Sequence, residues 1–456
     1  MRDLPSGADR MPDATAGHCH DVLVVGGGPA GCAAAITLAR LGRSVLLIEK
    51  DAHPRFHIGE SLLPMSMPLL QELGVLSEVE RIGVIKQGAD FPAETPGSYN
   101  VFRFTRSLHP TWPHAVQVRR ADFDQLLFAA ARAAGVQACE STRVTSVRHL
   151  GSGAQRRVLA EAHDAAGATH HYCARYLIDC SGRETLLGTQ FALKQRERRH
   201  QSAALFAHYT GVQRRTGEDA GNISIYRLAD GWAWLIPLPE GLTSIGLVCG
   251  PATLRARRGD QEAFLRQQCA AVPGLAERMA GAQLAGHLQA TGNYAYRCRR
   301  YAGPGWIMAG DATAFLDPIF SSGVHMALVT AIDAAGLVHA VLADPAREAP
   351  LQLSYTRRHR AAMRTMAWFI RRFNAPVMRR LFTQPRNDWQ LEQAIISMLA
   401  GDLHRDGGIR WRLRLFRVIY RITCLGDLRG ALAGVWQRWR RSREQFLPDP
   451  SHRGTT

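Results

Sequence analysis

Apolar residues in the first part of the chain form short runs that are separated by glycine-rich turns. The run Asp21 to Val25 leads into a glycine-rich stretch at 26–31, and an apolar stretch follows from Cys32 to Leu41. Short continuous runs are typical of buried parallel strands, and the longer stretch is typical of a helix packed on them. A further run at 44–48 ends in Glu49. This pattern predicts a strand, a tight turn, a helix and a second strand, which together begin an α/β fold.

The combination of an apolar run and a glycine turn returns later in the chain. Residues 177–180 lead into Ser181-Gly182, and residues 306–309 lead into Gly310. Between them, residues 231–237 carry bulky apolar side chains at alternate positions, which is typical of a strand with one buried face. Residues 324–342 predict a helix. We therefore expect a region of mixed sheet between separate parts of the α/β region.

Helical periodicity dominates after residue 347. Residues 355–385 and 391–401 predict helices with a break at Pro385, and residues 410–422 predict a basic amphipathic helix. One face of this last helix carries Arg410, Arg414, Arg417 and Arg421, and the neighbouring face carries Trp411, Leu415, Val418, Ile419 and Ile422. We expect the apolar face to cover the rest of the protein. Contact with an anionic membrane surface is the alternative, because cationic helices with Trp, Ile and Leu also suit bilayers.

Positive charge is concentrated in the same region. The formal net charge of the 456 residues is +17, and the last 106 residues, with 21 Arg and 7 acidic residues, hold +14 of it. A basic patch favours acidic partners, which include nucleic acid, anionic lipid and acidic proteins. No zinc-finger, RNA-recognition or helix-turn-helix signature accompanies the charge, so the sequence predicts no nucleic-acid partner.

Lysine and cysteine usage add two constraints. Of the 56 basic residues only Lys50, Lys86 and Lys194 are lysine, so each is a candidate for chemistry that Arg cannot perform. The nine cysteines lack metal-ligand spacing, which predicts reduced thiols in a cytoplasmic protein and no metal site. Residues 1–20 lack the apolar core of a signal peptide, and no uninterrupted apolar run reaches ~18 residues, so we expect no spanning helix.

The first glycine turn has the spacing of a dinucleotide-binding motif. Its GxGxxG residues are Gly26, Gly28 and Gly31, with Pro29 and Ala30 between them. The first glycine allows the bend, the second lets a pyrophosphate approach the backbone, and the third lets the helix pack on the strand. The helix N-terminus then faces the phosphates. Glu49, which Lys50 follows, stands where a carboxylate accepts hydrogen bonds from ribose hydroxyls.

Three further segments resemble a large group of flavoproteins that contains aromatic hydroxylases, geranylgeranyl reductases and halogenases. They are residues 118–124, 177–183 and 306–312, and the resemblance extends over residues 20–350. It implies that the dinucleotide is FAD, that Asp311 holds its ribityl chain, and that either Arg119 or Arg120 lies against it. A second GxGxxG motif is absent from the sequence. We therefore expect reduced flavin from a separate flavin reductase, although members of the group also bind NADPH transiently.

Three motifs resemble flavin-dependent halogenases within this group. The first is Trp232-x-Trp234-x-Ile236-Pro237, similar to the WxWxIP signature that lines the passage between flavin and substrate. The second matches FxxPxxSxG at Phe315, Pro318, Ser321 and Gly323, and the third is GESLLP at 59–64. The resemblance implies that Pro318, Gly323, Glu60 and Ser61 lie near the flavin. The N-terminal amides of the helix that begins near Ser321, Ser322 and Gly323 suit a halide or an anionic reduced flavin. Core packing is the alternative for the tryptophans, and related hydroxylases share the Pro and Gly.

Residues 82–91 resemble the family segment that carries a catalytic lysine, here Lys86. In the family this lysine either forms a haloamine or holds hypohalous acid by a hydrogen bond. Both roles need a primary amine, whose pKa falls on burial, whereas guanidinium is a poor nucleophile. A surface lysine is the alternative, since that is the usual fate of the residue.

The resemblance implies an FADH2- and O2-dependent halogenation of an electron-rich aromatic ring, in secondary-metabolite or pigment biosynthesis, with chloride or bromide as co-substrate. Halogenases of free tryptophan carry Glu before the motif serine, but this chain carries Phe320. It therefore resembles the phenol and pyrrole branch, whose members often use rings tethered to acidic acyl carrier proteins. The alternatives are an FAD monooxygenase, a geranylgeranyl-reductase-like oxidoreductase without halogenation, and a non-catalytic flavoprotein partner in a biosynthetic complex.

The expected organisation is an α/β fold with three parts. Residues 18–86, 119–190 and 292–346 form a Rossmann-like FAD-binding domain, residues 87–118 and 191–291 form a mixed-sheet substrate domain, and residues 347–456 form a basic helical region.

Overall fold

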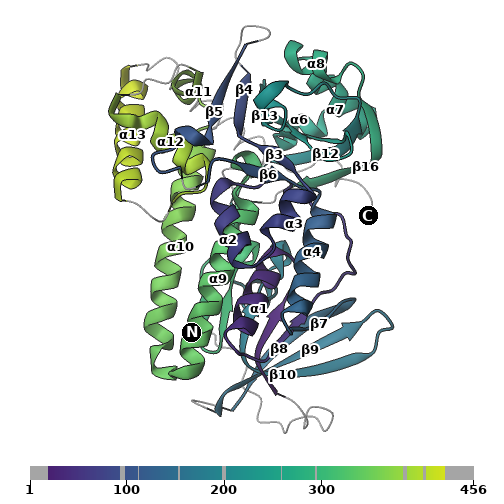
Figure 1. Ribbon diagram of the computed structural model, residues 1–456, viewed down its shortest axis with the longest axis vertical. Coiled ribbons are helices and arrows are strands. Elements are labelled where there is room, and N and C mark those ends of the chain that lie inside the picture. Colours follow the sequence, from purple (N-terminus) through teal and green to yellow (C-terminus); the bar gives the residue numbers. More distant parts are fainter. Residues whose placement is uncertain are drawn as a thin grey trace, which may run out of the picture.

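The computed structural model describes residues 19–92, 98–110, 112–151, 155–197, 202–257, 259–292, 295–383, 388–403 and 407–426. An α/β region, drawn at the bottom of Figure 1, carries a second sheet with its own helices at the top right and a group of helices at the top left. The three parts correspond to three apolar cores, one within the α/β region and one on each face of the second sheet.

The α/β region is built on a sheet in the order β18-β19-β10-β1-β2-β7, with β9 and β8 added beside β10. Its strands are β1 (Cys19–Val25), β2 (Val45–Ile48), β7 (Gln137–Cys139), β8 (Thr142–Leu150), β9 (Arg157–Asp164), β10 (Thr169–Asp179), β18 (Ala302–Gly303) and β19 (Trp306–Met308). The strands β1, β2, β7, β10 and β19 are parallel. All four residues of β2 are buried, as a parallel strand covered on both faces requires.

Helices α1 (Pro29–Arg40), α4 (Arg120–Ala133) and α9 (Ser322–Ala343) belong to the core of this region. The helix α1 begins three residues earlier than its apolar stretch predicted, because Pro29 already has the backbone angle of a first helical turn. Three shorter helices also occur along the chain, α2 (Met67–Glu72), α3 (Leu76–Arg81) and α5 (Leu186–Gln190). The chain also forms two small sheets: β3 (Val84–Lys86) pairs with β6 (Ala115–Gln117), and β11 (Lys194–Arg196) pairs with β17 (Tyr296–Cys298), which pairs with β20 (Ala314–Phe315).

By length and composition alone, α9 could cross a membrane, since its most apolar window has a mean hydropathy of 1.9. The run is interrupted by His325, Asp333 and His339, so it differs from the uninterrupted apolar run on which the expectation of no spanning helix was based. The helix packs against α1 and α10, and 56% of that window is buried inside the protein. A core helix with neighbours on several sides is apolar for the same reason as a spanning one.

The second sheet is mixed and runs in the order β16-β12-β15-β14-β13-β4-β5. Its strands are β4 (Gly88–Pro92), β5 (Tyr99–Arg103), β12 (Ala203–Thr210), β13 (Ile223–Leu228), β14 (Gly231–Pro237), β15 (Thr243–Cys249) and β16 (Gln283–Gly292). The helices α7 (Gln261–Ala270) and α8 (Pro273–Met279) cover one face, and α6 (Pro251–Arg255) follows β15. The opposite face meets the helices of the C-terminal part.

Those helices are α10 (Glu348–Ile370), α11 (Pro376–Thr383), α12 (Leu391–Leu399) and α13 (Gly407–Gly426). The prediction of one helix over 355–385 is wrong, because α10 ends at Ile370 and a turn separates it from α11. Pro376 occupies the first position of α11, where the missing N–H of proline is harmless. The predicted break at Pro385 lies outside the described residues.

The helix α13 docks through a face that includes only Leu415 and Ile419 of the apolar face we predicted, and both are partly buried. Its buried side chains are Ile409, Leu413, Phe416 and Tyr420, whereas Trp411, Val418 and Ile422 are exposed. Phe416 stacks on Phe369 of α10 with ring centroids 5.5 Å apart. Both stripes have helical spacing, and the sequence alone gives no preference between two apolar faces of one helix.

One pair of cysteines departs from the expectation of reduced thiols. Cys19 on β1 and Cys173 on β10 are directly opposite each other in the parallel register and form a disulfide, with Cα atoms 4.7 Å apart. A separation of 154 residues gives no sequence signal for such a pair. The other seven cysteines are free thiols.

Candidate active site

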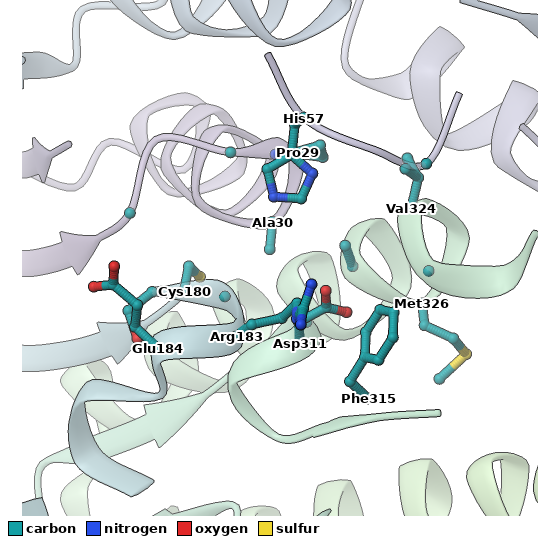
Figure 2. Close-up of a pocket in the computed structure, with 18 of the residues that line it drawn as sticks. Pro29, Ala30, His57, Cys180, Arg183, Glu184, Asp311, Phe315, Val324 and Met326 are labelled. Carbon is teal, nitrogen blue, oxygen red and sulfur yellow. The ribbon is translucent and has the colours of Figure 1, made fainter. Parts of the chain in front are cut away.

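A cavity of 990 Å³ runs from the first glycine turn to the second sheet. It begins at the carboxyl ends of β1, β2 and β10, the edge at which open α/β sheets bind their ligands. Figure 2 shows Pro29 and Ala30 on one side of it and Asp311, Phe315 and Met326 on the other. Its volume lies at the upper end of the range for small-molecule sites, ~300–1,000 Å³.

The three motif glycines have different surroundings. A Cβ on Gly31 would lie 1.7 Å from the carbonyl oxygen of Gly26, so this glycine lets α1 pack on the turn and does not line the cavity. Gly26 has a φ of +103°, and a Cβ there would lie 2.3 Å from the carbonyl oxygen of Cys180. A Cβ on Gly28 would meet only an Arg55 nitrogen at 3.6 Å. Gly28 therefore faces open space at the start of α1, as close approach of a pyrophosphate requires.

Glu49 closes the same end of the cavity. Its side-chain oxygens accept hydrogen bonds from the backbone N–H of Gly27, at 2.5 Å, and of Asp51, at 3.0 Å. These bonds fix the carboxylate in the cavity wall and leave acceptor capacity for a ribose hydroxyl. Lys50 also lines the cavity and pairs with Glu184.

The two adjacent arginines have separate roles. Arg120 lines the cavity, with its guanidinium held by Asp124 at 2.8 and 2.9 Å and by the carbonyl oxygen of Ile58 at 2.7 Å. Arg119 lies outside the cavity, where it pairs with Asp122 and Glu240. Arg119 precedes α4 and Arg120 is its first residue, so their side chains leave the backbone in different directions.

Asp311 lies in the middle of the cavity, beside Arg183 (Figure 2). Burial raises the pKa of its carboxyl to about 6, and the charges of Arg120 and Arg183 act against that rise. The carboxylate is thus available as a hydrogen-bond partner for a polyhydroxyl chain placed between the nucleotide end and the second sheet.

Sequence analysis missed His57, which points into the cavity above Ala30 (Figure 2). Its Nδ1 donates to the carbonyl oxygen of Ile58 at 2.8 Å. Burial, with a further contribution from Arg120, lowers the pKa of the imidazole to about 4, so the ring is neutral at physiological pH. A hint in the sequence was its position two residues before the GESLLP segment.

The FxxPxxSxG segment forms the wall at the second-sheet end. Pro318, Ser321, Ser322 and Gly323 all line the cavity. Ser321 has a φ of +53° and directly precedes α9, which brings the first amides of that helix to the cavity wall. A Cβ on Gly323 would meet no atom within 4 Å, so there is open space beside this turn.

Trp232, Trp234 and Ile236 project from one face of β14 and line the same end. The two indole rings lie 5.5 Å apart, and Trp234 donates from Nε1 to Ser244 Oγ at 3.2 Å. A Cβ on Gly246 of β15 would lie 2.0 Å from the ring of Trp234, so this glycine makes room for the indole. Pro237 ends the strand and does not line the cavity.

Lys86 is the last residue of β3 and does not itself line the cavity. Its side chain is buried, and its Nζ donates to Ser61 Oγ at 2.8 Å and lies 5.4 Å from the ring centroid of Phe104. Burial alone lowers the pKa of the amine from 10.5 to about 7. Ser61 itself lines the cavity, so one hydrogen bond connects Lys86 to the cavity wall.

Glu60, the residue before Ser61, lines the cavity too. Its Oε1 accepts a hydrogen bond from His208 Nε2 on β12 at 2.6 Å. His208 is a second residue that sequence analysis missed, because a single histidine in a strand of the second sheet has no distinguishing pattern.

The cavity therefore matches FAD part by part: open backbone at the start of α1 for the pyrophosphate, Glu49 for a ribose, Asp311 for the ribityl chain, and aromatic and helix-terminal groups at the far end for the ring system. The match depends on the open space beside Gly28 and on the polar side chains that line the cavity.

Comparison with known proteins gives the same assignment. Residues 20–369 match the family model of the FAD binding domain. The chain is 34% identical over 331 residues to 1H-pyrrole-2-carbonyl-[peptidyl-carrier protein] brominase of Pseudoalteromonas luteoviolacea, which covers 70% of this chain and 77% of the brominase. It is 32% identical over 342 residues to flavin-dependent halogenase armH1 of Armillaria mellea, covering 70% of this chain and 65% of armH1. The chain thus spans about two thirds of the length of that relative.

Solved structures with the same fold include two flavoproteins of similar size. The structure of flavin-dependent brominase Bmp2 has a TM-score of 0.78 and 28% identity, and covers 90% of this chain and all of Bmp2. The structure of a flavoprotein/dehydrogenase from Cytophaga hutchinsonii has a TM-score of 0.81 and 28% identity. The match covers 89% of this chain and the whole of the other chain.

Proposed function

This chain belongs to the flavin-dependent halogenase family, and we propose that it chlorinates or brominates an electron-rich aromatic ring with FAD as its cofactor. The observation that carries the proposal is the position of Lys86. A buried amine, with no carboxylate partner among the described residues, is one hydrogen bond away from Ser61, which lines the FAD cavity together with Trp232 and Trp234.

Different residues of the cavity have different roles in the proposed reaction. Bound and reduced FAD, together with O2, supplies the oxidising power that converts halide to hypohalous acid. The first turn of α1 and Glu49 hold the nucleotide, and Asp311 and Arg120 hold the middle of the cofactor. The amides at the start of α9, beside Ser321 to Gly323, hold the halide at the ring end.

The tryptophan wall keeps the aromatic substrate away from the flavin. Trp232 and Trp234 are buried, large and packed against each other, so a second ring cannot lie against the flavin from this side. Direct transfer of oxygen to a substrate needs such contact, whereas a small hypohalous acid molecule can pass between side chains. The wall therefore favours halogenation over hydroxylation.

Lys86 receives the halogen at the end of this passage. With a pKa of about 7, a large share of the amine is neutral at physiological pH, and a neutral amine can form a haloamine or hydrogen-bond hypohalous acid. Ser61 positions the amine by accepting its hydrogen bond. The electrophilic halogen is then presented to the ring on the far side of Lys86 from the cavity.

We propose a phenol or a pyrrole as the substrate, carried on an acidic carrier protein. Phe320 stands where halogenases of free tryptophan have a glutamate, and in the structure its ring packs on Phe373 with centroids 5.9 Å apart. The brominase at 34% identity acts, by its name, on a pyrrole carried by a peptidyl carrier protein. The net charge of +14 on the last 106 residues suits such an acidic partner. A separate flavin reductase would supply reduced FAD.

The test is mass spectrometry of turnover with purified protein, FAD, a flavin reductase, NADH and O2. Phenols and pyrroles, free and carrier-bound, are offered with chloride and then with bromide. A product with the isotope pattern of a halogen is the expected result. A product that gains one oxygen atom would identify a monooxygenase instead, and carrier-bound rings that fail where the free acids react would remove the carrier from the proposal.

A further inference from the structure

The pair Glu60–His208 is a buried acid–base site that the chemistry of Lys86 does not use. Glu60 is 1% exposed, and its Oε1 accepts from His208 Nε2 at 2.6 Å. Within the described part of the chain, its Oε2 is buried and has no hydrogen-bond partner. An unsatisfied buried carboxylate oxygen is costly, which points to a ligand, a water molecule or a proton at that position.

Glu60 lines the ring end of the FAD cavity, whereas Lys86 does not line the cavity. Consecutive residues of an extended segment project in opposite directions, so Ser61 reaches Lys86 while Glu60 reaches β12. Glu60 lines the cavity together with Trp232, Trp234 and Ser321. The Glu60 carboxylate is thus close to the part of the cavity where halide would be oxidised, and it reaches a different partner from the one that holds Lys86.

His208 connects this position to solvent. Its side chain is 16% exposed and does not line the cavity, so its accessible surface faces outside the cavity. It lies beside Phe56, a half-exposed residue whose ring centroid is 5.6 Å from that of His208. The order from outside to inside is therefore solvent, His208, Glu60 and the cavity.

Halide oxidation consumes a proton in that cavity. Halide, FADH2, O2 and one proton give hypohalous acid, oxidised FAD and water. Halide and FADH2 each give up two electrons, the O–O bond breaks, and one oxygen leaves in hypohalous acid and the other in water. The later substitution, in which hypohalous acid and an aromatic C–H give a carbon–halogen bond and water, needs no further proton.

We propose that Glu60 and His208 form a proton relay that supplies this proton from solvent to the cavity in every turnover. His208 takes up a proton at its exposed side and passes it to Glu60, and Glu60 delivers it to the cavity. The inference rests on the proposed function, because that reaction defines the demand for a proton.

Other charged groups near the pair are occupied or lie on another side. Arg120 approaches Gly59, but its guanidinium is held by Asp124 and by the carbonyl oxygen of Ile58. Lys86 approaches the segment from the opposite side through Ser61. His57 also faces the cavity, but its pKa of about 4 makes it a poor proton carrier at physiological pH.

A binding measurement tests the relay without any turnover. FAD is titrated into the apoprotein by calorimetry in buffers of different ionisation enthalpy, between about pH 6 and pH 8, which counts the protons taken up. In the proposed relay, Glu60 holds a proton for delivery to the cavity once FAD is bound. We expect proton uptake in the wild type and a clear loss of it in both Glu60→Gln and His208→Gln, with FAD affinity within about threefold of the wild type in each, i.e. less than ~0.7 kcal/mol.

The matched control is Glu140→Gln. Glu140 also pairs with a histidine, His53, at 2.8 Å, but neither residue lines the cavity. This variant should take up as many protons as the wild type. Asp311 can contribute to proton uptake in the wild type and in every variant. The relay is therefore tested by the difference in proton uptake between Glu60→Gln and the wild type.

Turnover gives the second measurement. In Glu60→Gln and His208→Gln, halogenated product per O2 consumed should fall by ~10²-fold, the effect of losing a general acid, and the missing oxygen should appear as hydrogen peroxide. Unchanged proton uptake in Glu60→Gln would overturn the relay, and so would an unchanged ratio of product to O2. A wild type that takes up the proton on FAD binding but never halogenates would instead refute the proposed function.

Discussion

The two ends of the cavity are built in different ways. The nucleotide end consists of backbone: three glycines, the first turn of α1, and a glutamate held by two amide N–H groups. The end at the second sheet consists of side chains from distant segments, such as Lys86 with Ser61 and Trp234 with Ser244. The first end tolerates almost no change in shape, whereas the second end can change its chemistry while the cofactor stays bound.

The largest effect is expected where the backbone is tightest. In Gly31→Ala the new Cβ would lie 1.7 Å from the carbonyl oxygen of Gly26, so the turn must open and FAD binding should be lost together with all activity. The affinity for FAD is measured by the quenching of flavin fluorescence during titration. The control is Gly336→Ala on α9, where a Cβ meets no atom within 4 Å and binding should remain. Normal FAD affinity in Gly31→Ala would contradict the role of this turn.

At the other end, Lys86→Met should separate binding from chemistry. The variant keeps the volume of the side chain but has no amine, so halogenation should fall by ~10²–10⁴-fold while FAD affinity is unchanged. Product formation by mass spectrometry and FAD titration measure the two quantities. A variant that still halogenates at a tenth of the wild-type rate would remove Lys86 from the mechanism.

The same variant should be more stable than the wild type at low pH. Because the folded pKa of Lys86 is about 7 and the unfolded value is 10.5, the unfolded chain binds the proton more tightly. The burial of the amine therefore destabilises the fold below pH 7, by up to about 5 kcal/mol, and the penalty declines as pH rises from 7 towards 10.5. Urea unfolding of the wild type and of Lys86→Met across this pH range measures the difference in their free energies of unfolding. A stability difference that does not vary with pH would contradict the shifted pKa.

Smaller effects distinguish the two apolar faces of α13. Phe416→Ala removes a buried ring that packs on Phe369, and should lower the free energy of unfolding by ~3–5 kcal/mol. Trp411→Ala removes an exposed ring on the other face and should change it by less than ~0.5 kcal/mol. Denaturant unfolding of the two variants compares them directly, and equal losses would show that the Trp411 face is also packed.

The contrast between the two ends also explains what the sequence could predict. The glycine spacing, Glu49 and Asp311 belong to local motifs, and local backbone geometry is largely determined by local sequence. Arg119 and Arg120 could not be separated, since the choice depends on where α4 begins. His57 and His208 were missed because their roles depend on residues that are distant in the sequence. His57 lies near Arg120, and His208 is hydrogen-bonded to Glu60. The docked face of α13 depended likewise on the shape of its neighbours.

The most direct test is a pH titration of the three lysine side chains by NMR. With only Lys50, Lys86 and Lys194 in the chain, lysine labelled with 13C at Cε gives three signals, which Lys50→Arg, Lys86→Met and Lys194→Arg assign. The structure predicts that the Lys86 signal titrates at a pKa of about 7. A Lys86 signal that titrates near 10.5 would mean that the amine is charged and solvated, and would contradict its role as the halogen carrier.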